Sequence, residues 1–506
     1  MEGRAAYPPR RDSEAFLMKI DATEIAALLP FILVSAVGCA TLLVDAFVKH
    51  RTLGLRLAQM GLLAAMAAVV GQWADQGAGV RMFSGMWVAD RMALFLDVVF
   101  IATGLGTLMV AAPFMQEHDF EHGEHHALVV LAVAGMMIVG HAGHLLSLLI
   151  GIETMSLAVY LLVASRRRQS LGAEGALKYL LFGAFAAGFL VYGTAFIYGT
   201  TGGAMSYAAI AAVAGVAAGN PLFVMGVYFL LVGLLFKIAA VPFHMWTPEA
   251  YQGAPTPVTG FMAAGVKTAA IGGLLRLLGA AFADSGLTLG HAGWVRVLGG
   301  LAALTMTWGN LAALRQDNVK RMLAYSSIAH AGYLLVGLAA RGLRLDGAQP
   351  ALLTYLAAYA FTSLGVFAVV AWVGRRDDER WLVAGWSGLA RTRPMVALAM
   401  AVLLLSLAGV PPTGGFFGKF YIFRAAMQSP DLVWLVIVAV LNSVVSVYYY
   451  LRIVVAMYFR EPTRPWNLYP STGTGLVLTA TVLLVLALGI VPGPVIDLAA
   501  GGMGLR

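Results

Sequence analysis

Tyr228-Phe-Leu-Leu-Val-Gly-Leu-Leu-Phe-Lys-Ile-Ala-Ala-Val-Pro242 is an apolar run with a single charge, Lys237, which lies five residues before a proline. Lys267 and Lys419 lie in similar apolar runs further along the chain. A charged side chain at bilayer depth costs at least about 2.5–3.5 kcal/mol, so such residues usually mark ion or proton pathways. The three lysines predict a chain that handles protons or ions inside a membrane.

The composition indicates the fold class. The chain has 506 residues, of which 60% are hydrophobic and 11% charged, and its mean hydropathy is +0.82. A soluble domain is usually about a quarter charged. A transmembrane helix needs about 20 apolar residues, and the sequence has about fourteen such runs. We expect an all-α polytopic membrane protein with one transmembrane domain over residues 25–506.

Residues 1–24 form a polar N-terminal extension that we expect to be disordered. The basic residues at its start conflict with the orientation that the loops predict. The residues before Met18 are therefore either a disordered tail or not translated.

The distribution of basic residues predicts the orientation of the chain. Sixteen of the 33 Lys and Arg residues fall in one set of alternate loops, and six fall in the opposite loops and the C-terminal tail. Because cytoplasmic loops carry the excess of Lys and Arg, the first set is expected in the cytoplasm and both termini on the other side. This bias accounts for the net charge of +8 without any nucleic-acid partner.

A weak internal repeat divides the chain. Ala176–Phe185 aligns without gaps to Leu352–Phe361, with Tyr, Leu, Ala and Phe at matching positions. We predict two inverted five-helix repeats, one over spans 4–8 (residues 127–282) and one over spans 9–13 (residues 295–460).

Each repeat is predicted to contain a broken helix. The breaks fall at Ala240-Val-Pro-Phe243 and Gly409-Val-Pro-Pro412. Proline frees a backbone carbonyl, which is tolerated at membrane depth only where the backbone is buried in protein or lines a wet cavity. Broken helices at matching positions of two halves are typical of transport proteins.

Candidate proton carriers lie near these breaks. Glu153 is mid-span, and Lys178 lies near the start of the following span. Burial weakens the hold of a lysine on its proton and a nearby carboxylate restores it, so a moving Glu–Lys pair can take up and release protons. Lys237 is expected on the last turn of a half-helix, where the helix dipole favours its positive charge.

Two histidines and one further acid complete the candidates. His244 follows the first break and is either a proton carrier or a hydrogen-bonded core histidine. His330 lies mid-span beside hydroxyl residues, a composition that suits a chain of waters. Asp97 is a mid-span acid for which we expect a structural role.

The segment Glu117-His-Asp-Phe-Glu-His-Gly-Glu-His-His126 resembles a metal site in composition. It falls in a connection between two spans, and we expect a solvated loop rather than a metal centre. The chain has one cysteine and no dinucleotide-binding glycine motif, so we expect no cofactor bound by this chain.

Phe236-Lys-Ile-Ala-Ala-Val-Pro-Phe-His-Met-Trp-Thr-Pro-Glu-Ala-Tyr-Gln-Gly-Ala-Pro-Thr-Pro-Val258 resembles the signature of the antiporter-like N, M and L subunits of respiratory complex I. Tyr251–Val258 and a lysine in the second broken helix, Lys419, resemble subunit N in particular. The resemblance runs from about Ile25 to Val491 and implies fourteen helices with a polar axis across the membrane centre.

By position, the resemblance implies proton-relay roles for seven residues: Glu153, Lys178, Lys237, Lys267, Lys419, His244 and His330. It also implies a multi-pass protein of the bacterial inner membrane whose partners are subunit M, neighbouring small membrane subunits and lipid. NADH, FMN, iron–sulfur clusters and quinone would be used by partner subunits. The alternatives are a proton/cation antiporter subunit of a multisubunit Na⁺/H⁺ exchanger and a membrane scaffold without transport.

Overall fold

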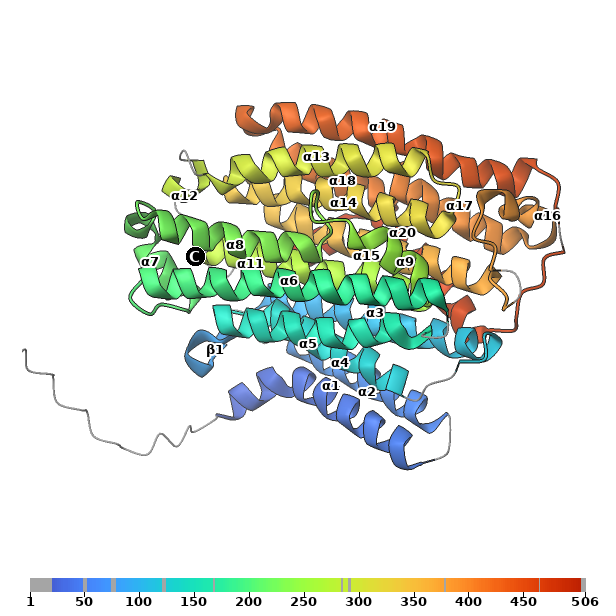
Figure 1. The fold of residues 1–506 in the computed structure, drawn as a ribbon, viewed down its shortest axis with the longest axis horizontal. Coiled ribbons are helices and arrows are strands. Elements are labelled where there is room, and N and C mark those ends of the chain that lie inside the picture. Colours follow the sequence, from blue (N-terminus) through green and yellow to red (C-terminus); the bar gives the residue numbers. More distant parts are fainter. Residues whose placement is uncertain are drawn as a thin grey trace, which may run out of the picture.

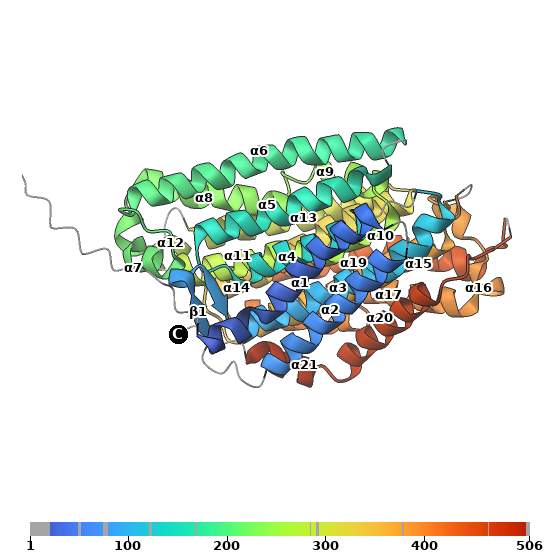
Figure 2. The same cartoon turned by 90° about the horizontal axis from the view of Figure 1, so that it is seen from below.

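The computed structural model describes residues 21–48, 52–73, 79–120, 124–166, 169–283, 285–289, 293–376, 379–463 and 465–501. The segment before Met18 and most of the predicted N-terminal extension lie outside the described residues. Within the described part, the long helices run roughly parallel in one bundle (Figures 1 and 2).

The helices that are long and apolar enough to cross a membrane number twelve in the described residues. They are α1 (Ala22–Phe47), α2 (Leu53–Gln72), α3 (Arg91–Glu117), α4 (Glu124–His141), α5 (Leu145–Val163), α6 (Ser170–Thr200), the continuous stretch α10–η3–α11 (Thr256–Phe261, Met262–Val266 and Lys267–Ala281), α13 (Trp294–Leu314), α14 (Val319–Gly342), α15 (Ala348–Val373), α19 (Pro430–Phe459) and α20 (Thr472–Ile490).

Two further spans are broken, which brings the total within the described residues to the fourteen expected. The first is α8 (Pro221–Lys237) followed by α9 (Trp246–Gly253), and the second is α17 (Pro394–Ala408) followed by α18 (Gly414–Ala426). Both breaks fall at the prolines that the sequence indicated. The inverted symmetry of the two halves stays a prediction.

Short elements occupy the two ends of the bundle. At one end lie β1 (Val80–Met82) and β2 (Trp87–Ala89), an antiparallel hairpin with Val80 opposite Ala89, which the sequence did not predict. The remaining short elements are η1 (Phe83–Gly85), η2 (Ala164–Arg166), α7 (Tyr207–Ala217), α12 (Ser285–Leu289), η4 (Val383–Trp386), α16 (Leu389–Thr392) and α21 (Gly493–Ala500). Figure 1 shows β1, α7 and α12 at one end and α16 at the other.

Burial separates central helices from peripheral ones. The apolar window of Thr256–Ala281 is wholly buried, and those of α14 and α15 are 94% buried. In α1 and α6 only 28% of the window is buried, and large side chains such as Phe185 face outward. The polar residues on α11, α14 and α15 therefore lie in the middle of the protein, away from lipid.

Candidate functional site

Lys237 is the last residue of α8 and is 2% exposed. Its Nζ donates to Ser156 Oγ at 2.7 Å and to Tyr160 Oη at 3.0 Å, both on α5. Trp246, just after the break, donates its indole N–H to the carbonyl of Phe236 at 3.1 Å. The ammonium group is thus held by neutral hydroxyls at the end of a half-helix, as the position of Pro242 predicted.

Glu153 lies on the same face of α5 as Ser156 and Tyr160, three and seven residues earlier. Its carboxylate interacts electrostatically with both Lys237 and Tyr160. Its Oε1 atom is buried without a hydrogen-bond partner among the described residues. Glu153 therefore lies close to Lys237 without a direct ion pair in the described structure.

Contacts from other helices stabilise the non-helical backbone at the first break. The backbone N–H of Val241 donates to Thr305 Oγ1 on α13 at 3.0 Å, which satisfies a donor that the helix no longer pairs. His244 is half-buried here, and its ring lies edge-on to Trp308 with centroids 6.1 Å apart. His244 is thus at the break and at the edge of the bundle, outside the Lys237 cluster.

Lys267 begins α11 directly after the π-helical segment η3. The side chain is 2% exposed, and its Nζ donates to both the carbonyl oxygen and the Oγ of Ser327 on α14, each at 2.5 Å. Ser327 Oγ also lies 2.9 Å from Tyr359 Oη and 3.3 Å from Tyr251 Oη. One serine therefore joins a lysine and two tyrosines in the centre of the protein.

His330 lies one turn after Ser327 on α14 and is 2% exposed. Its Nδ1 is 2.5 Å from Tyr355 Oη and its Nε2 is 3.2 Å from Tyr450 Oη. Tyr450 Oη in turn shares a hydrogen bond with Ser326 Oγ. Both ring nitrogens thus face tyrosine hydroxyls from different helices, an arrangement that can pass a proton from one side of the ring to the other.

Lys419 on α18 reaches back to the end of α17. Its Nζ donates to the carbonyl oxygens of Leu407 at 3.0 Å and Ala408 at 3.2 Å. The ammonium also lies 4.6 Å from the ring centroid of Tyr333. The negative end of the α17 dipole and the face of an aromatic ring both stabilise its positive charge.

The buried groups form two clusters along the bundle. Lys267 and Lys419 both interact electrostatically with His330, so the second cluster runs from Lys267 through His330 to Lys419. No direct hydrogen bond joins the Lys237 cluster to Lys267 among the described residues. The nearest described link is Trp246 against Tyr251, with ring centroids 6.5 Å apart.

Lys178 does not pair with Glu153 in the described structure. It forms an ion pair with Glu174 at 2.6 Å, one turn earlier on α6, and the two side chains are 40% and 55% exposed. The pair lies on the surface of the chain rather than in either buried cluster. The i, i+4 spacing that produces it was readable in the sequence.

Sequence reasoning missed the acceptors of the buried lysines and one buried lysine. Lys320 is 1% exposed and donates to the carbonyl of Ala254 at 2.7 Å. Its position near the start of α14 made it look like a loop charge. The spacing Glu153-x-x-Ser-x-x-x-Tyr160, which places three polar groups on one helix face, could have revealed the acceptors of Lys237.

A buried ion pair lies close to Lys320. Arg166 Nη2 is 2.7 Å from Glu379 Oε1, with the side chains 7% and 12% exposed. Burial alone would raise the pKa of Glu379, but the hydrogen bond and charge of Arg166 hold that pKa below its usual value. This pair ties the connection after α5 to the connection after α15.

The prediction of a solvated loop is wrong for the described histidines of the histidine-rich segment, because α3 and α4 extend into it from both sides, whereas Asp119 and Glu124 are exposed as expected. His118, His125 and His126 are all buried, and burial lowers the pKa of His118. His122 lies outside the described residues. In the part of the chain that the structure describes, no three His, Cys, Asp or Glu side chains are grouped to hold a metal ion.

Asp97 pairs with a histidine at the other end of the bundle. His141 Nε2 is 2.8 Å from Asp97 Oδ2, and its Nδ1 is 3.0 Å from the carbonyl oxygen of Val88 on β2. The ring also stacks on Trp87, with centroids 4.1 Å apart. These contacts hold the hairpin against α3 and α4, which supports the structural role expected for Asp97.

Known proteins resemble this chain over most of its length. Residues 142–446 match the family described as NADH:quinone oxidoreductase/Mrp antiporter, TM. NADH-quinone oxidoreductase subunit N of Trichlorobacter lovleyi is 42% identical over 93% of this chain and 95% of its own. Subunit N 1 of Sorangium cellulosum is 47% identical over 80% and 81% of the two chains.

Solved structures give the same result. A chain of respiratory complex I from Thermus thermophilus with bound aureothin superposes with a TM-score of 0.78 at 34% identity, covering 94% of this chain and all of that one. A chain of an archaeal membrane-bound sulfane sulfur reductase, at 24% identity and a TM-score of 0.84, shares the fold. The chain therefore belongs to the subunit N family of NADH:quinone oxidoreductase, the antiporter-like, proton-translocating membrane subunits of bacterial respiratory complex I.

Proposed function

We propose that Glu153, Lys237, Lys267, His330 and Lys419 form the proton relay of this subunit. Electron transfer from NADH to quinone, carried out in partner subunits, would drive it. The relay crosses the centre of the bundle between the two broken helices. His244, at the edge of the first break, would connect the Lys237 cluster to one membrane surface.

The observation that carries the proposal is the kind of acceptor that holds each lysine. Lys237, Lys267 and Lys419 are buried, and their described hydrogen bonds go to hydroxyls and backbone carbonyls. A lysine with a purely structural role in the interior is normally paired with a carboxylate. An ammonium group that is hydrogen-bonded only to neutral acceptors has no carboxylate to stabilise its protonated form. It can therefore pass its proton to a neighbouring group more readily.

The hydrogen bonds suggest an order for the second cluster. Ser327 contacts Lys267 and lies one turn from His330. Tyr355 and Tyr450 flank the two nitrogens of His330. A proton leaving Lys267 would pass by hydroxyl exchange and reach Lys419 through His330. Protonation of one lysine disfavours protonation of the next because like charges repel. A movement of Glu153 relative to Lys237 would change the proton affinity of the first lysine, and the repulsion would carry that change along the relay in one direction.

The remaining expectations concern the setting of the relay. The loops rich in arginine would face the cytoplasm and both termini the other side. Lys178 and Glu174 lie on the exposed face of α6, where a neighbouring subunit such as M would cover them. Flavin, iron–sulfur clusters and quinone would remain with partner subunits.

The test uses the whole complex carrying single substitutions, reconstituted in vesicles, with quinone reduction and proton uptake measured together. Lys267→Ala should depress both by at least about tenfold, the effect of roughly 1.4 kcal/mol at a step that limits turnover. Lys178→Ala is the matched control and should retain much more activity. Normal pumping by Lys267→Ala in a fully assembled complex would exclude the relay.

A further inference from the structure

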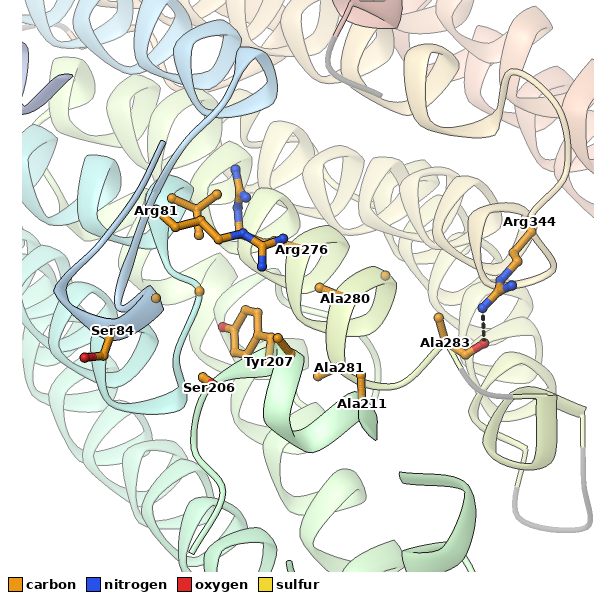
Figure 3. A pocket seen from close by; sticks show the side chains of 15 residues that line it. Arg81, Ser84, Ser206, Tyr207, Ala211, Arg276, Ala280, Ala281, Ala283 and Arg344 are labelled. Carbon is orange, nitrogen blue, oxygen red and sulfur yellow. Dashed lines mark hydrogen bonds between the residues drawn. The ribbon is translucent and has the colours of Figure 1, made fainter. Parts of the chain in front are cut away.

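A cavity of about 520 Å³ opens at the end of the bundle that carries the hairpin, away from the proposed relay. Its walls come from β1, α7, α11 and the connection after α14 (Figure 3). Three arginines line it, Arg81, Arg276 and Arg344, together with Ser84, Ser206 and Tyr207. The loops at this end of the bundle belong to the alternate set that holds few Lys and Arg residues. Three arginines around one cavity are therefore unusual at this end.

Arg276 supplies hydrogen-bond donors at the wall of the cavity. The residue is 3% exposed, and its guanidinium donates to Asp90 through Nη1 at 2.8 Å and Nη2 at 2.7 Å, and to the Gly140 carbonyl through Nε at 2.8 Å. A guanidinium has five N–H donors. Two therefore remain without an acceptor among the described residues, while Asp90 fixes the orientation of the group.

Tyr207 provides a third unused donor beside Arg276. It is 3% exposed, and its hydroxyl is buried with no hydrogen-bond partner among the described residues. The hydroxyl and the guanidinium interact electrostatically, and Figure 3 shows the two side chains on the same side of the cavity. A buried donor that is left unpaired destabilises the folded protein, and a ligand with several acceptor oxygens would remove that cost.

Arg81 and Arg344 give the cavity an excess of positive charge. Both are exposed. Arg344 donates to the carbonyl of Ala283 at 3.1 Å, a contact that leaves its charge uncompensated. Because Asp90 offsets only Arg276, these two arginines leave the described walls cationic.

One wall of the cavity is apolar and faces outward. The helix α7, Tyr-Ala-Ala-Ile-Ala-Ala-Val-Ala-Gly-Val-Ala over 207–217, has no charged residue. Ala208 and Ala211 line the cavity, and Val216 further along is 90% exposed. A cationic cavity bounded by an exposed apolar helix suits an amphiphile whose head is anionic and whose chains are hydrocarbon.

We propose that this cavity binds the phosphate group of a membrane phospholipid, with the acyl chains along α7. Phosphate oxygens would accept from Arg276, Tyr207, Arg81 and Arg344, since guanidinium groups match phosphate geometry. The site is independent of the proton relay, so its loss would not abolish pumping directly. The same chemistry could also hold free inorganic phosphate, and the experiment separates the two sources.

The experiment follows the modification of Arg81 and Arg344 by phenylglyoxal in the delipidated whole complex, read out by peptide mass spectrometry. Phosphatidylglycerol in mixed micelles should slow both reactions by about tenfold at roughly ten times its Kd. A galactolipid, which has no phosphate, should not. Arg296 on α13, exposed and outside the cavity, serves as the internal reference and should react at the same rate throughout.

The outcomes are distinct. Protection by inorganic phosphate equal to that by phosphatidylglycerol would overturn the lipid assignment, and no protection by either would overturn the site. Tyr207→Phe removes only the hydroxyl and should weaken the protection several-fold. Tyr198→Phe, a half-exposed tyrosine on α6, should leave it unchanged. Unaltered protection in Tyr207→Phe would exclude the buried hydroxyl as a ligand.

Discussion

Lys267 donates two hydrogen bonds to a single residue, Ser327, one to its carbonyl oxygen and one to its hydroxyl. The serine side chain is also the meeting point of Tyr251 and Tyr359. A hydroxyl has one proton to donate and two lone pairs to accept with, so its contacts with the lysine and the tyrosines are mutually dependent. A change in the charge of Lys267 must therefore alter the hydrogen bonds of both tyrosines.

Ser327→Ala should remove one of the two hydrogen bonds that Lys267 donates and keep the other. The backbone carbonyl still accepts, but the shared hydroxyl is lost, and a hydrogen bond to a charged group contributes about 1.5–3 kcal/mol. We expect coupled turnover to fall by about tenfold or more while the complex still assembles. Proton uptake in vesicles measures this. Ser165→Ala, which removes only a bond within its own helix end, should have little effect, and equal activity of the two variants would contradict the prediction.

Glu153→Gln keeps the size of the side chain and removes its charge. If the carboxylate drives protonation changes at Lys237 by moving relative to it, pumping should fall by about tenfold, with quinone reduction falling in parallel. Glu174→Gln, in the surface pair with Lys178, is the control and should pump at close to the normal rate. Full pumping by Glu153→Gln would remove this residue from the relay.

Lys419 can be tested as a titrating group or as a fixed charge. Lys419→Ala should depress coupled turnover in either case. Lys419→Arg keeps the charge, but arginine holds its proton at all accessible pH values, so a titrating role predicts that it fails nearly as badly as the alanine variant. Quinone reduction and proton uptake are measured for both. Near-normal pumping by Lys419→Arg would leave only an electrostatic role.

Gly418→Ala should disturb His330 without touching it. A Cβ at Gly418 would lie 2.5 Å from Tyr355 Cδ2 and 3.1 Å from its Cα, so the tyrosine that contacts His330 Nδ1 must shift. We expect a loss of stability of about 1–3 kcal/mol and slower pumping. Gly300→Ala, with no atom within 4 Å of its new Cβ, should be neutral or stabilise α13 by up to about 1 kcal/mol. Thermal unfolding and proton uptake of both variants test this.

The Arg166–Glu379 pair predicts acid sensitivity. Since the folded pKa of Glu379 lies below its ordinary value of 4.5, the stability from this pair is complete above that value and is lost as pH falls through the folded pKa. Glu379→Gln should cost about 3–5 kcal/mol at neutral pH because it leaves Arg166 buried and unpaired. It should also flatten the decline of thermal stability in acid.

A matched control for that pair lies on the surface. Arg391 and Glu461 are joined at 3.0 Å, but the side chains are 56% and 83% exposed, so Glu461→Gln should change stability by no more than about 1 kcal/mol. Scanning fluorimetry of the purified complex over a range of pH compares the two variants. If Glu379→Gln lowered stability as little as Glu461→Gln does, the stabilising role of the buried Arg166–Glu379 pair would be contradicted.

The number of spans and both helix breaks could be predicted because apolar length and proline act locally. The β1–β2 hairpin could not, since its three-residue strands depend on the packing of Trp87 against Phe31 and His141, which come from distant parts of the chain. The histidine-rich segment was misjudged for a related reason: composition suggested a loop, whereas packing of α3 and α4 carries His118 and His126 into the interior.

The candidate lysines were found from sequence because a charge in an apolar run stands out. Their acceptors were not, because Ser156 and Ser327 look like ordinary small residues of a membrane helix and become acceptors only when another helix brings a lysine to them. Lys178 and Lys320 show the same limit. The sequence suggested that each lies near the start of a span, and that position alone gave no sign that Lys178 lies on the surface and Lys320 in the interior.

Lys419 also closes the end of another helix, α17, by binding the carbonyl oxygens of Leu407 and Ala408. Gly409, which follows Ala408 with a φ of 86°, caps the same terminus by donating its backbone N–H to the carbonyl oxygens of Leu405 and Ser406. Lys419 binds the last two carbonyl oxygens of the helix, which the glycine leaves unpaired, and only a charged ammonium group offers three donors for them. If Lys419 releases its proton during turnover, the position of the α17 terminus and the proton affinity of Lys419 are thermodynamically linked. A displacement of α17 relative to α18 would then change that affinity, and loss of the proton would loosen the terminus.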